Sequence, residues 1–195
     1  MTSLCLIRHG QTAWNAEGRI QGQEDIPLDE FGVGQVKDLV AYVLKFKQLD
    51  TIYSSPLLRA LDTSHIIQKK SGTSVVDIIQ DDRLQERHYG LWQGMLDSEV
   101  KEKYPITWNR NWRMCGPPGG ESQSQLVIRA ASFIEEVLHE RTGQQIAIVS
   151  HECLLGAMLG YILKMPLEMH RTLRWSNCGH VWVEYINGHP RLAFQ

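Results

Sequence analysis

The fold is decided first by the stretch Leu4-Cys5-Leu6-Ile7-Arg8-His9-Gly10, in which four apolar residues precede an arginine, a histidine and a glycine. A short apolar run that ends at glycine is typical of a buried strand. An arginine and a histidine at the end of such a strand suit anion chemistry, in which the guanidinium holds an oxyanion and the imidazole attacks it or its neighbour. The stretch Ile146-Ala147-Ile148-Val149-Ser150-His151 repeats this context. We therefore expect two strand ends that each deliver a histidine to one site.

Predicted strands and helices alternate along the rest of the chain. Strands are expected at 50–54, 74–79, 145–150, 180–186 and 192–194. Helices are expected at 30–46, after Pro56, and at 97–104, 122–141 and 154–163. This alternation predicts an α/β fold, a three-layer sandwich with a mostly parallel central sheet flanked by helices. Ligands of such sheets bind at the carboxyl ends of the strands, the edge where His9 and His151 fall.

The 195 residues show no repeat, low-complexity tract or linker, so we expect a single domain over 1–195. One excursion, at about 95–121, is rich in tryptophan and turn residues and is expected to form a lid. Trp108, Trp112 and Met114 either line a pocket or pack the lid onto the core. Arg110 and Arg113 of the same segment offer a second contact for an anion.

Composition and charge narrow the functional classes. A net charge of −2 gives no indication of a nucleic-acid partner or of a surface for anionic membranes. The four cysteines form no CxxC pair and no zinc-like spacing, so we expect no metal site and a reduced, cytoplasmic protein. No signal peptide is apparent, and no apolar stretch approaches the ~18 residues of a membrane span.

Two further residues fit a site at the same edge of the sheet. Arg59 lies about one helical turn beyond the strand expected at 50–54 and is able to point back, although a lone arginine on a helix is ordinarily solvated. Glu86 lies beside aromatic residues and glycines, a setting that raises the pKa of a carboxyl and suits a general acid. The histidines with no motif around them are expected on the surface: His65, His139, His170 and His189.

Together these pieces resemble the histidine phosphatase superfamily, the phosphoglycerate-mutase-like group. Five elements carry the resemblance, in order and over nearly the whole chain: Arg8-His9-Gly10-Gln11-Thr12 with Asn15, Arg59 in its Ser-Ser-Pro-Leu-x-Arg-Ala setting, Glu86, Gly119-Gly120-Glu121-Ser122, and Val149-Ser150-His151. The resemblance implies that His9 attacks phosphorus and forms a phosphohistidine. Arg8, Arg59 and His151 would surround the phosphoryl oxygens.

The same resemblance assigns the remaining roles. Glu86 would protonate the leaving alkoxide and later accept a proton from the attacking water. No metal cofactor is needed, because cationic side chains supply the positive charge that Mg²⁺ supplies elsewhere. The implied partner is a small-molecule phosphomonoester, and the protein is expected to be a monomer or a homodimer. The residues expected to contact the substrate are Asn15, Gln21, Gly22, Arg87, His88, Tyr89 and Glu152.

Two activities of this superfamily compete. The stretch Glu86-Arg87-His88-Tyr89-Gly90 is similar to phosphoglycerate mutases that depend on 2,3-bisphosphoglycerate. Those enzymes, however, carry a lysine soon after Gln93-Gly94 and a long insert, and this chain has neither. A metal-independent phosphatase is therefore preferred, with such a mutase as the alternative. A non-catalytic member that binds a phospho-ligand is the third hypothesis.

Glu152 is a departure from the superfamily pattern, which commonly has glycine after the second histidine. A carboxylate beside an anion pocket repels the substrate unless it points away or pairs with a cation. The sequence leaves this choice open.

Overall fold

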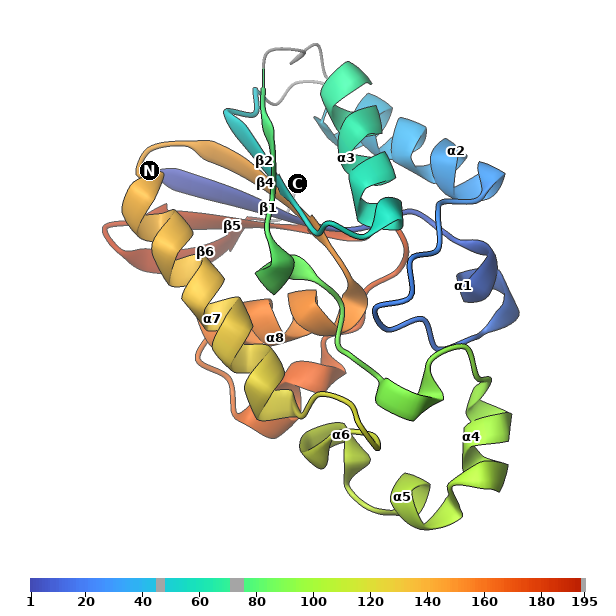
Figure 1. Ribbon diagram of the computed structural model, residues 1–195. Helices are drawn as coiled ribbons and strands as arrows, with labels where there is room; N and C mark the ends of the chain where they lie inside the picture. Colours follow the sequence, from blue (N-terminus) through green and yellow to red (C-terminus); the bar gives the residue numbers. More distant parts are fainter. Residues whose placement is uncertain (45–47, 71–75, 194–195) are drawn as a thin grey trace.

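The computed structural model, which describes residues 1–44, 48–70 and 76–193, is built on a six-stranded sheet (Figure 1). The strands are β1 (Thr2–Arg8), β2 (Thr51–Ser54), β3 (Ile78–Gln80), β4 (Gln145–Ser150), β5 (His180–Ile186) and β6 (His189–Ala193). Their order is β3-β2-β4-β1-β5-β6; β1 to β4 run parallel, and β5 and β6 add two antiparallel pairings. The expected α/β fold with a mostly parallel sheet is confirmed.

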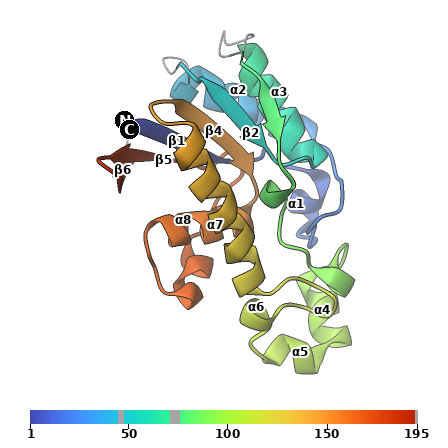
Figure 2. The ribbon, with the colours of Figure 1, turned by 60° about the vertical axis from the view of Figure 1, so that its left-hand side comes forward.

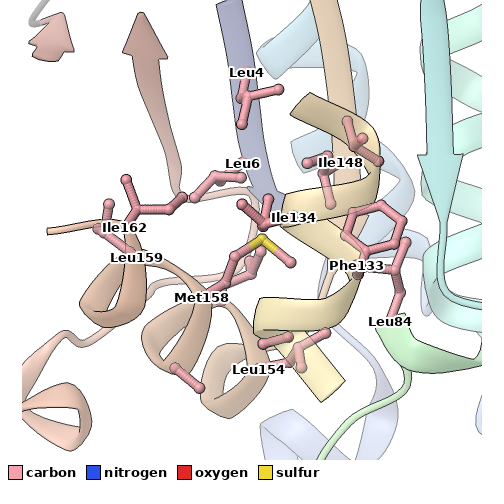
Figure 3. Close-up of a cluster of buried hydrophobic side chains, with 14 of the residues drawn as sticks. Leu4, Leu6, Leu84, Phe133, Ile134, Ile148, Leu154, Met158, Leu159 and Ile162 are labelled. Carbon is pink, nitrogen blue, oxygen red and sulfur yellow. The ribbon is translucent and has the colours of Figure 1, made fainter. Parts of the chain in front are cut away.

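The strands of the centre are apolar on both sides because helices cover both faces of the sheet (Figure 2). Side chains alternate along a strand. Leu4 and Leu6 of β1 therefore pack toward α7 (Gln123–Glu140) and α8 (Glu152–Ile162), in the cluster that Figure 3 shows. Cys5 and Ile7 pack toward α2 (Glu30–Leu39) and α3 (Leu58–Lys70) on the other face. The helices are α1 (Ala13–Glu17), α2 (Glu30–Leu39), α3 (Leu58–Lys70), α4 (Asp97–Lys103), α5 (Pro105–Asn109), α6 (Trp112–Cys115), α7 (Gln123–Glu140) and α8 (Glu152–Ile162).

The long helix α7 begins where its sequence signal lies. The Ser122 hydroxyl accepts a hydrogen bond from the Gln125 N–H, and the Gln125 side chain accepts one from the Ser122 N–H. This capping box satisfies two N–H groups that lack partners within the helix. It also fixes the point at which the preceding excursion ends.

Three predicted elements differ from the structure. The last strand, expected at 192–194, is β6 and begins at His189, where pairing with Ile186 of β5 starts. The helix expected to run to Phe46 is α-helical only to Leu39 and continues as a π-helical turn, Val40–Leu44; Phe46 lies outside the described residues. The strand expected at 74–79 is β3, which begins at Ile78, where pairing with Ile52 of β2 starts. Ser74 and Val75 of that prediction are outside the described residues, as is Phe194 of the last predicted strand.

The excursion at 95–121 folds into three short helices, α4, α5 and α6, at one end of the molecule (Figure 1). A separate apolar cluster holds them: Trp92, Val100 and Trp112 are buried, and Trp108 packs against them. The rings of Trp92 and Trp112 meet edge to face, with centroids 4.9 Å apart. The tryptophans thus pack the excursion onto the chain, and Trp112 also borders the larger cavity described below.

Candidate active site

The two histidines meet because β1 and β4 are parallel neighbours in the sheet. Arg8 and Ser150 are paired at the last position of the two strands, so the next residue of each is a histidine. The His9 and His151 rings lie with centroids 5.1 Å apart, and both side chains are buried. The strand register places two distant segments side by side at the carboxyl edge of the sheet.

His9 is held as a neutral imidazole. Its Nδ1 lies 2.6 Å from the carbonyl oxygen of Gly10, which accepts only if Nδ1 carries the proton. That tautomer leaves Nε2 with a free lone pair. Burial, followed by the charges of Arg59 and Arg8, holds the pKa of His9 well below its usual value. The ring is therefore an unprotonated nitrogen nucleophile at neutral pH.

Arg59 is the buried cation of the site, only 1% exposed. Its Nη1 and Nη2 donate to the carbonyls of Glu24 and Gly22, each at 2.7 Å. Burial lowers the pKa of Arg59 to about 10, so the guanidinium remains charged at neutral pH. Arg59 points from α3 back to the strand ends, as expected, since its Nε donates to His151 and its side chain lines the same cavity as His9.

His151 is tied on both ring nitrogens. Its Nδ1 accepts from Arg59 Nε at 3.2 Å, so the neutral ring carries its proton on Nε2, which donates to Ser55 Oγ at 2.8 Å. Burial, and next the charge of Arg59, holds the pKa of His151 well below its usual value. The His151 ring therefore contacts both Arg59, through its Nδ1 hydrogen bond, and the His9 ring.

Glu86 lies against the beginning of α8. Its carboxylate accepts hydrogen bonds from the N–H groups of Arg87 at 2.7 Å, Cys153 at 3.2 Å and Leu154 at 3.3 Å. Burial raises the pKa of Glu86, and the first two of these bonds oppose the shift. A carboxyl with a raised pKa that lines the same cavity as a neutral imidazole is equipped to exchange a proton with a ligand there.

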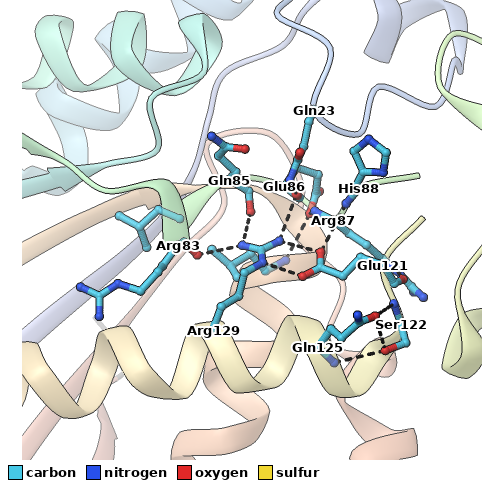
Figure 4. Close-up of polar contacts among 12 residues, drawn as sticks. Gln23, Arg83, Gln85, Glu86, Arg87, His88, Glu121, Ser122, Gln125 and Arg129 are labelled. Carbon is cyan, nitrogen blue, oxygen red and sulfur yellow. Dashed lines mark hydrogen bonds and ion pairs between the residues drawn. The ribbon is translucent and has the colours of Figure 1, made fainter. Parts of the chain in front are cut away.

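Sequence reasoning missed Arg129, which fixes the segment that carries Glu86 (Figure 4). From α7, Arg129 donates to the carbonyls of Arg83, Gln85 and Glu86 at 2.6–3.0 Å. It also forms a two-pronged ion pair with Glu121, at 2.7 and 2.9 Å. No local signal distinguishes this arginine from a solvated helix residue, because its acceptors are main-chain carbonyls of a distant loop.

A small cavity of about 140 Å³ brings most of the predicted residues together. Asn15 Oδ1 already accepts from Thr12 and from Asn177 Nδ2, so its donor for a ligand is Nδ2. Gln21 is buried, and its Oε1 has no hydrogen-bond partner in the described part of the chain. The predicted residues that line this cavity are Arg8, His9, Asn15, Gln21, Gly22, Arg59, Glu86, Tyr89 and Glu152.

A larger cavity of about 520 Å³ adjoins the small one; Tyr89, Glu152 and Cys153 border both. Arg87 lines it, buried, with its guanidinium donating to the Glu121 carbonyl at 2.8 Å and lying 5.7 Å from the Trp112 ring centroid. Burial raises the pKa of the Cys153 thiol to about 12, so this cysteine is not a thiolate nucleophile.

His88, a predicted substrate contact, is not brought into either cavity. Its Nδ1 accepts the N–H of Gly90 at 3.2 Å, and its side chain points away from Glu86 in Figure 4. His170 is a second difference: it was expected on the surface, yet it is 3% exposed and lines the larger cavity. Gly160 makes room for its ring, since a Cβ there would lie 2.4 Å from His170 Cγ.

Glu152 pairs with two cations, which answers the question that the sequence left open. Its Oε2 lies 3.3 Å from Arg8 Nη1 and its Oε1 lies 2.9 Å from Arg174 Nε. The carboxylate therefore neither points away from the anion pocket nor stands unpaired. It occupies the boundary between the two cavities.

Two kinds of feature are absent from residues 1–44, 48–70 and 76–193. No three His, Cys, Asp or Glu side chains gather there so that they could hold a metal ion. No helix in these ranges is long and apolar enough to cross a membrane.

Comparison with known proteins agrees with this geometry. A model of the histidine phosphatase superfamily (branch 1) matches residues 4–195. Phosphoserine phosphatase 1 of Hydrogenobacter thermophilus is 38% identical, over 92% of this chain and 85% of its own. Probable phosphoglycerate mutase GpmB of Photorhabdus laumondii is 36% identical, over 99% and 89%. Mycobacterial glucosyl-3-phosphoglycerate phosphatase, solved in complex with VO3, superimposes with a TM-score of 0.86 at 29% identity, over 98% and 96%.

The chain belongs to the histidine phosphatase superfamily. It is an enzyme of the phosphatase kind, with phosphatases and mutase-like proteins among its relatives. The expected superfamily and its phosphoglycerate-mutase-like fold are confirmed.

Proposed function

We propose that the protein hydrolyses phosphomonoesters through a phosphohistidine formed on His9. The observation that carries the proposal is the neutral His9 ring, fixed by the Gly10 carbonyl and bordered in one cavity by Arg8, Arg59 and Glu86. In this proposal His9 is the nucleophile, Arg8 and Arg59 are the two cations for a phosphoryl group, and Glu86 is the proton donor for the leaving oxygen. These are the groups that phosphoryl transfer to nitrogen requires.

The first half-reaction moves the phosphoryl group to the enzyme. The phosphoryl oxygens bind Arg8 and Arg59, and each Nη group of Arg59 has a second hydrogen beyond the one held by a carbonyl. The lone pair of His9 Nε2 attacks phosphorus, the P–O ester bond breaks, and Glu86 gives its proton to the leaving oxygen. Preorganised donors of this kind typically lower the barrier by ~3–4 kcal/mol each.

The second half-reaction returns the enzyme to its starting state. Water attacks phosphorus, Glu86 takes a proton from that water, and the P–N bond breaks to release inorganic phosphate. A contact of His151 with the phosphoryl oxygens, which the superfamily resemblance implies, requires its Nε2–H to exchange Ser55 for the phosphoryl group. Asn15 Nδ2 and Gln21 border the same cavity and complete the substrate contacts that we propose.

We propose that the reaction needs no metal cofactor, because Arg8 and Arg59 supply the positive charge that a divalent ion supplies in other phosphoryl-transfer enzymes. The partner is a small-molecule phosphomonoester rather than a nucleic acid or a membrane. A cytoplasmic monomer or homodimer remains our expectation for its location and assembly.

The larger cavity favours a phosphorylated acid as substrate. Arg87 is a buried cation, and no ion pair is found for it within the described part of the chain. Buried charges are normally paired, so an anionic group of the substrate is the expected partner. The relatives named phosphoserine phosphatase and glucosyl-3-phosphoglycerate phosphatase both take their names from phosphorylated acids.

A mutase that uses 2,3-bisphosphoglycerate is the second candidate, favoured by the 36% identity to a probable phosphoglycerate mutase. The deciding experiment is phosphorus NMR of the protein with 3-phosphoglycerate, catalytic 2,3-bisphosphoglycerate and EDTA. We expect free phosphate to accumulate. A growing 2-phosphoglycerate signal would establish the mutase instead.

A non-catalytic, ligand-binding role is the third candidate. His9→Ala distinguishes it: we expect complete loss of phosphatase activity with retained folding. Activity that survives this substitution would contradict the phosphohistidine mechanism.

A further inference from the structure

Glu152 holds a position that the proposed reaction does not use. It opens α8, directly after His151, and borders both cavities. Its side chain is partly buried, at 24% exposure, so its charge is only partly screened by solvent. The carboxylate is therefore placed to act on a ligand in either cavity.

The geometry points to competition for Arg8. We propose that Glu152 is an internal competitor of the phosphoryl group for the Arg8 guanidinium, and that it promotes release of the phosphate product. Glu152 Oε2 lies 3.3 Å from Arg8 Nη1, so it forms an ion pair with the guanidinium that would bind a phosphoryl oxygen. This inference rests on the proposed function, since it takes Arg8 as a phosphoryl ligand.

Arg174 makes the competition reversible. Its Nε holds the other oxygen of Glu152 at 2.9 Å, while its own side chain is 81% exposed. When a phosphoryl dianion binds Arg8, Glu152 retains one cationic partner, so it is not left unpaired. When the product is to leave, Glu152 returns to Arg8 and replaces the phosphate oxygen.

The other charges around Arg8 support this arrangement. Arg8 Nη1 also donates to the Trp175 carbonyl, whereas its Nε is buried with no hydrogen-bond partner among the described residues. Within the described ranges, Glu152 is the carboxylate that forms an ion pair with Arg8. Without it, Arg8 would present its full charge to the phosphate.

Inhibition by inorganic phosphate tests the proposal, with p-nitrophenyl phosphate as substrate. Glu152→Gln keeps the size of the side chain and removes its charge. We expect the inhibition constant of phosphate to fall roughly tenfold, because a like charge close to the dianion is removed. High salt should shrink the difference between variant and wild type.

Two matched variants complete the test. Asp97→Asn removes a negative charge that borders the larger cavity without a contact to Arg8, and should leave the inhibition constant unchanged. Arg174→Gln frees Glu152 to pair with Arg8 alone and should raise the constant. An unchanged or higher constant in Glu152→Gln would overturn the proposal, as would a fall of equal size in Asp97→Asn.

Two different results would contradict the proposed phosphatase function and the proposed role of Glu152. A wild-type protein that hydrolyses no phosphomonoester would contradict the phosphatase mechanism. Binding of inorganic phosphate, measured by calorimetry on the same three variants, would still report the competition at Arg8. Equal phosphate affinity of wild type and Glu152→Gln would then refute the role of Glu152.

Discussion

At the residue scale, burial shifts the pKa values of two residues that line the small cavity, His9 and Glu86, in opposite directions. Burial lowers the pKa of His9 and raises the pKa of Glu86, because in each case it disfavours the charged form. Burial thus favours the uncharged form of each side chain, which is the form that the proposed mechanism needs for His9 as nucleophile and for Glu86 as proton donor. Both effects come from the same removal of water at the carboxyl edge of the sheet.

The acid role of Glu86 predicts a dependence on the leaving group. Glu86→Gln should slow hydrolysis of alkyl phosphates by about 100-fold or more, since an alkoxide needs a proton as it leaves. Nitrophenolate leaves without one, so p-nitrophenyl phosphate should be affected far less. Measuring kcat/KM for a series of esters against leaving-group pKa checks this. Equal losses across the series would remove Glu86 from the acid role.

At the element scale, α7 holds the segment that carries Glu86 through Arg129, which donates hydrogen bonds to three carbonyls of that segment. Arg129→Met should cost about 3 kcal/mol of unfolding free energy, because it breaks the largely buried pair with Glu121. Activity should fall further than stability explains, since the Glu86 main chain is released. Urea unfolding and kcat measured on one preparation test both effects.

The matched control lies at the start of the same helix. Ser122→Ala removes the α7 cap and should cost about 1 kcal/mol, without touching the Glu86 segment. Its kcat should remain close to that of the wild type under conditions where both proteins are folded. If Arg129→Met and Ser122→Ala lose activity in proportion to stability, Arg129 only stabilises the fold.

At the scale of the whole molecule, two buried neutral histidines make stability depend on pH. The pKa values of His9 and His151 are lower in the folded protein than the unfolded value of about 6.5. The unfolded chain therefore binds more protons below that pH. The free energy of unfolding should be highest above pH 6.5 and fall as the pH drops below it, by up to ~1.4 kcal/mol per pH unit for each histidine.

Replacing one of the two histidines measures its contribution to the pH dependence of the unfolding free energy. His9→Asn should show a shallower loss of stability between pH 6.5 and 5 than the wild type, because one proton fewer is taken up on unfolding. Denaturant midpoints across this range provide the measurement, and His65→Asn, at an exposed position of α3, serves as the control. Identical slopes for wild type and His9→Asn would show that the buried His9 does not contribute.

Local sequence signals were sufficient to predict the layered fold and to place Arg8, His9 and His151 at the strand ends. Apolar runs, helix periodicity and caps are local signals, so β1, β4 and α7 were predicted close to their observed bounds. The superfamily motifs then indicated which residue types gather at the sheet edge. The residue at which β3 begins could not be predicted from local composition, because pairing with β2 sets it.

The pairing of the charges could not be predicted from the sequence and follows from the packing of the folded chain. Contacts between segments far apart in the chain place Glu152 between Arg8 and Arg174. Contacts of the same kind hold Arg129 on three loop carbonyls and bury His170. A residue type specifies what a side chain is able to bind. The partner it binds, and the water it loses, are set by the packing of other elements around it, and no local pattern records that.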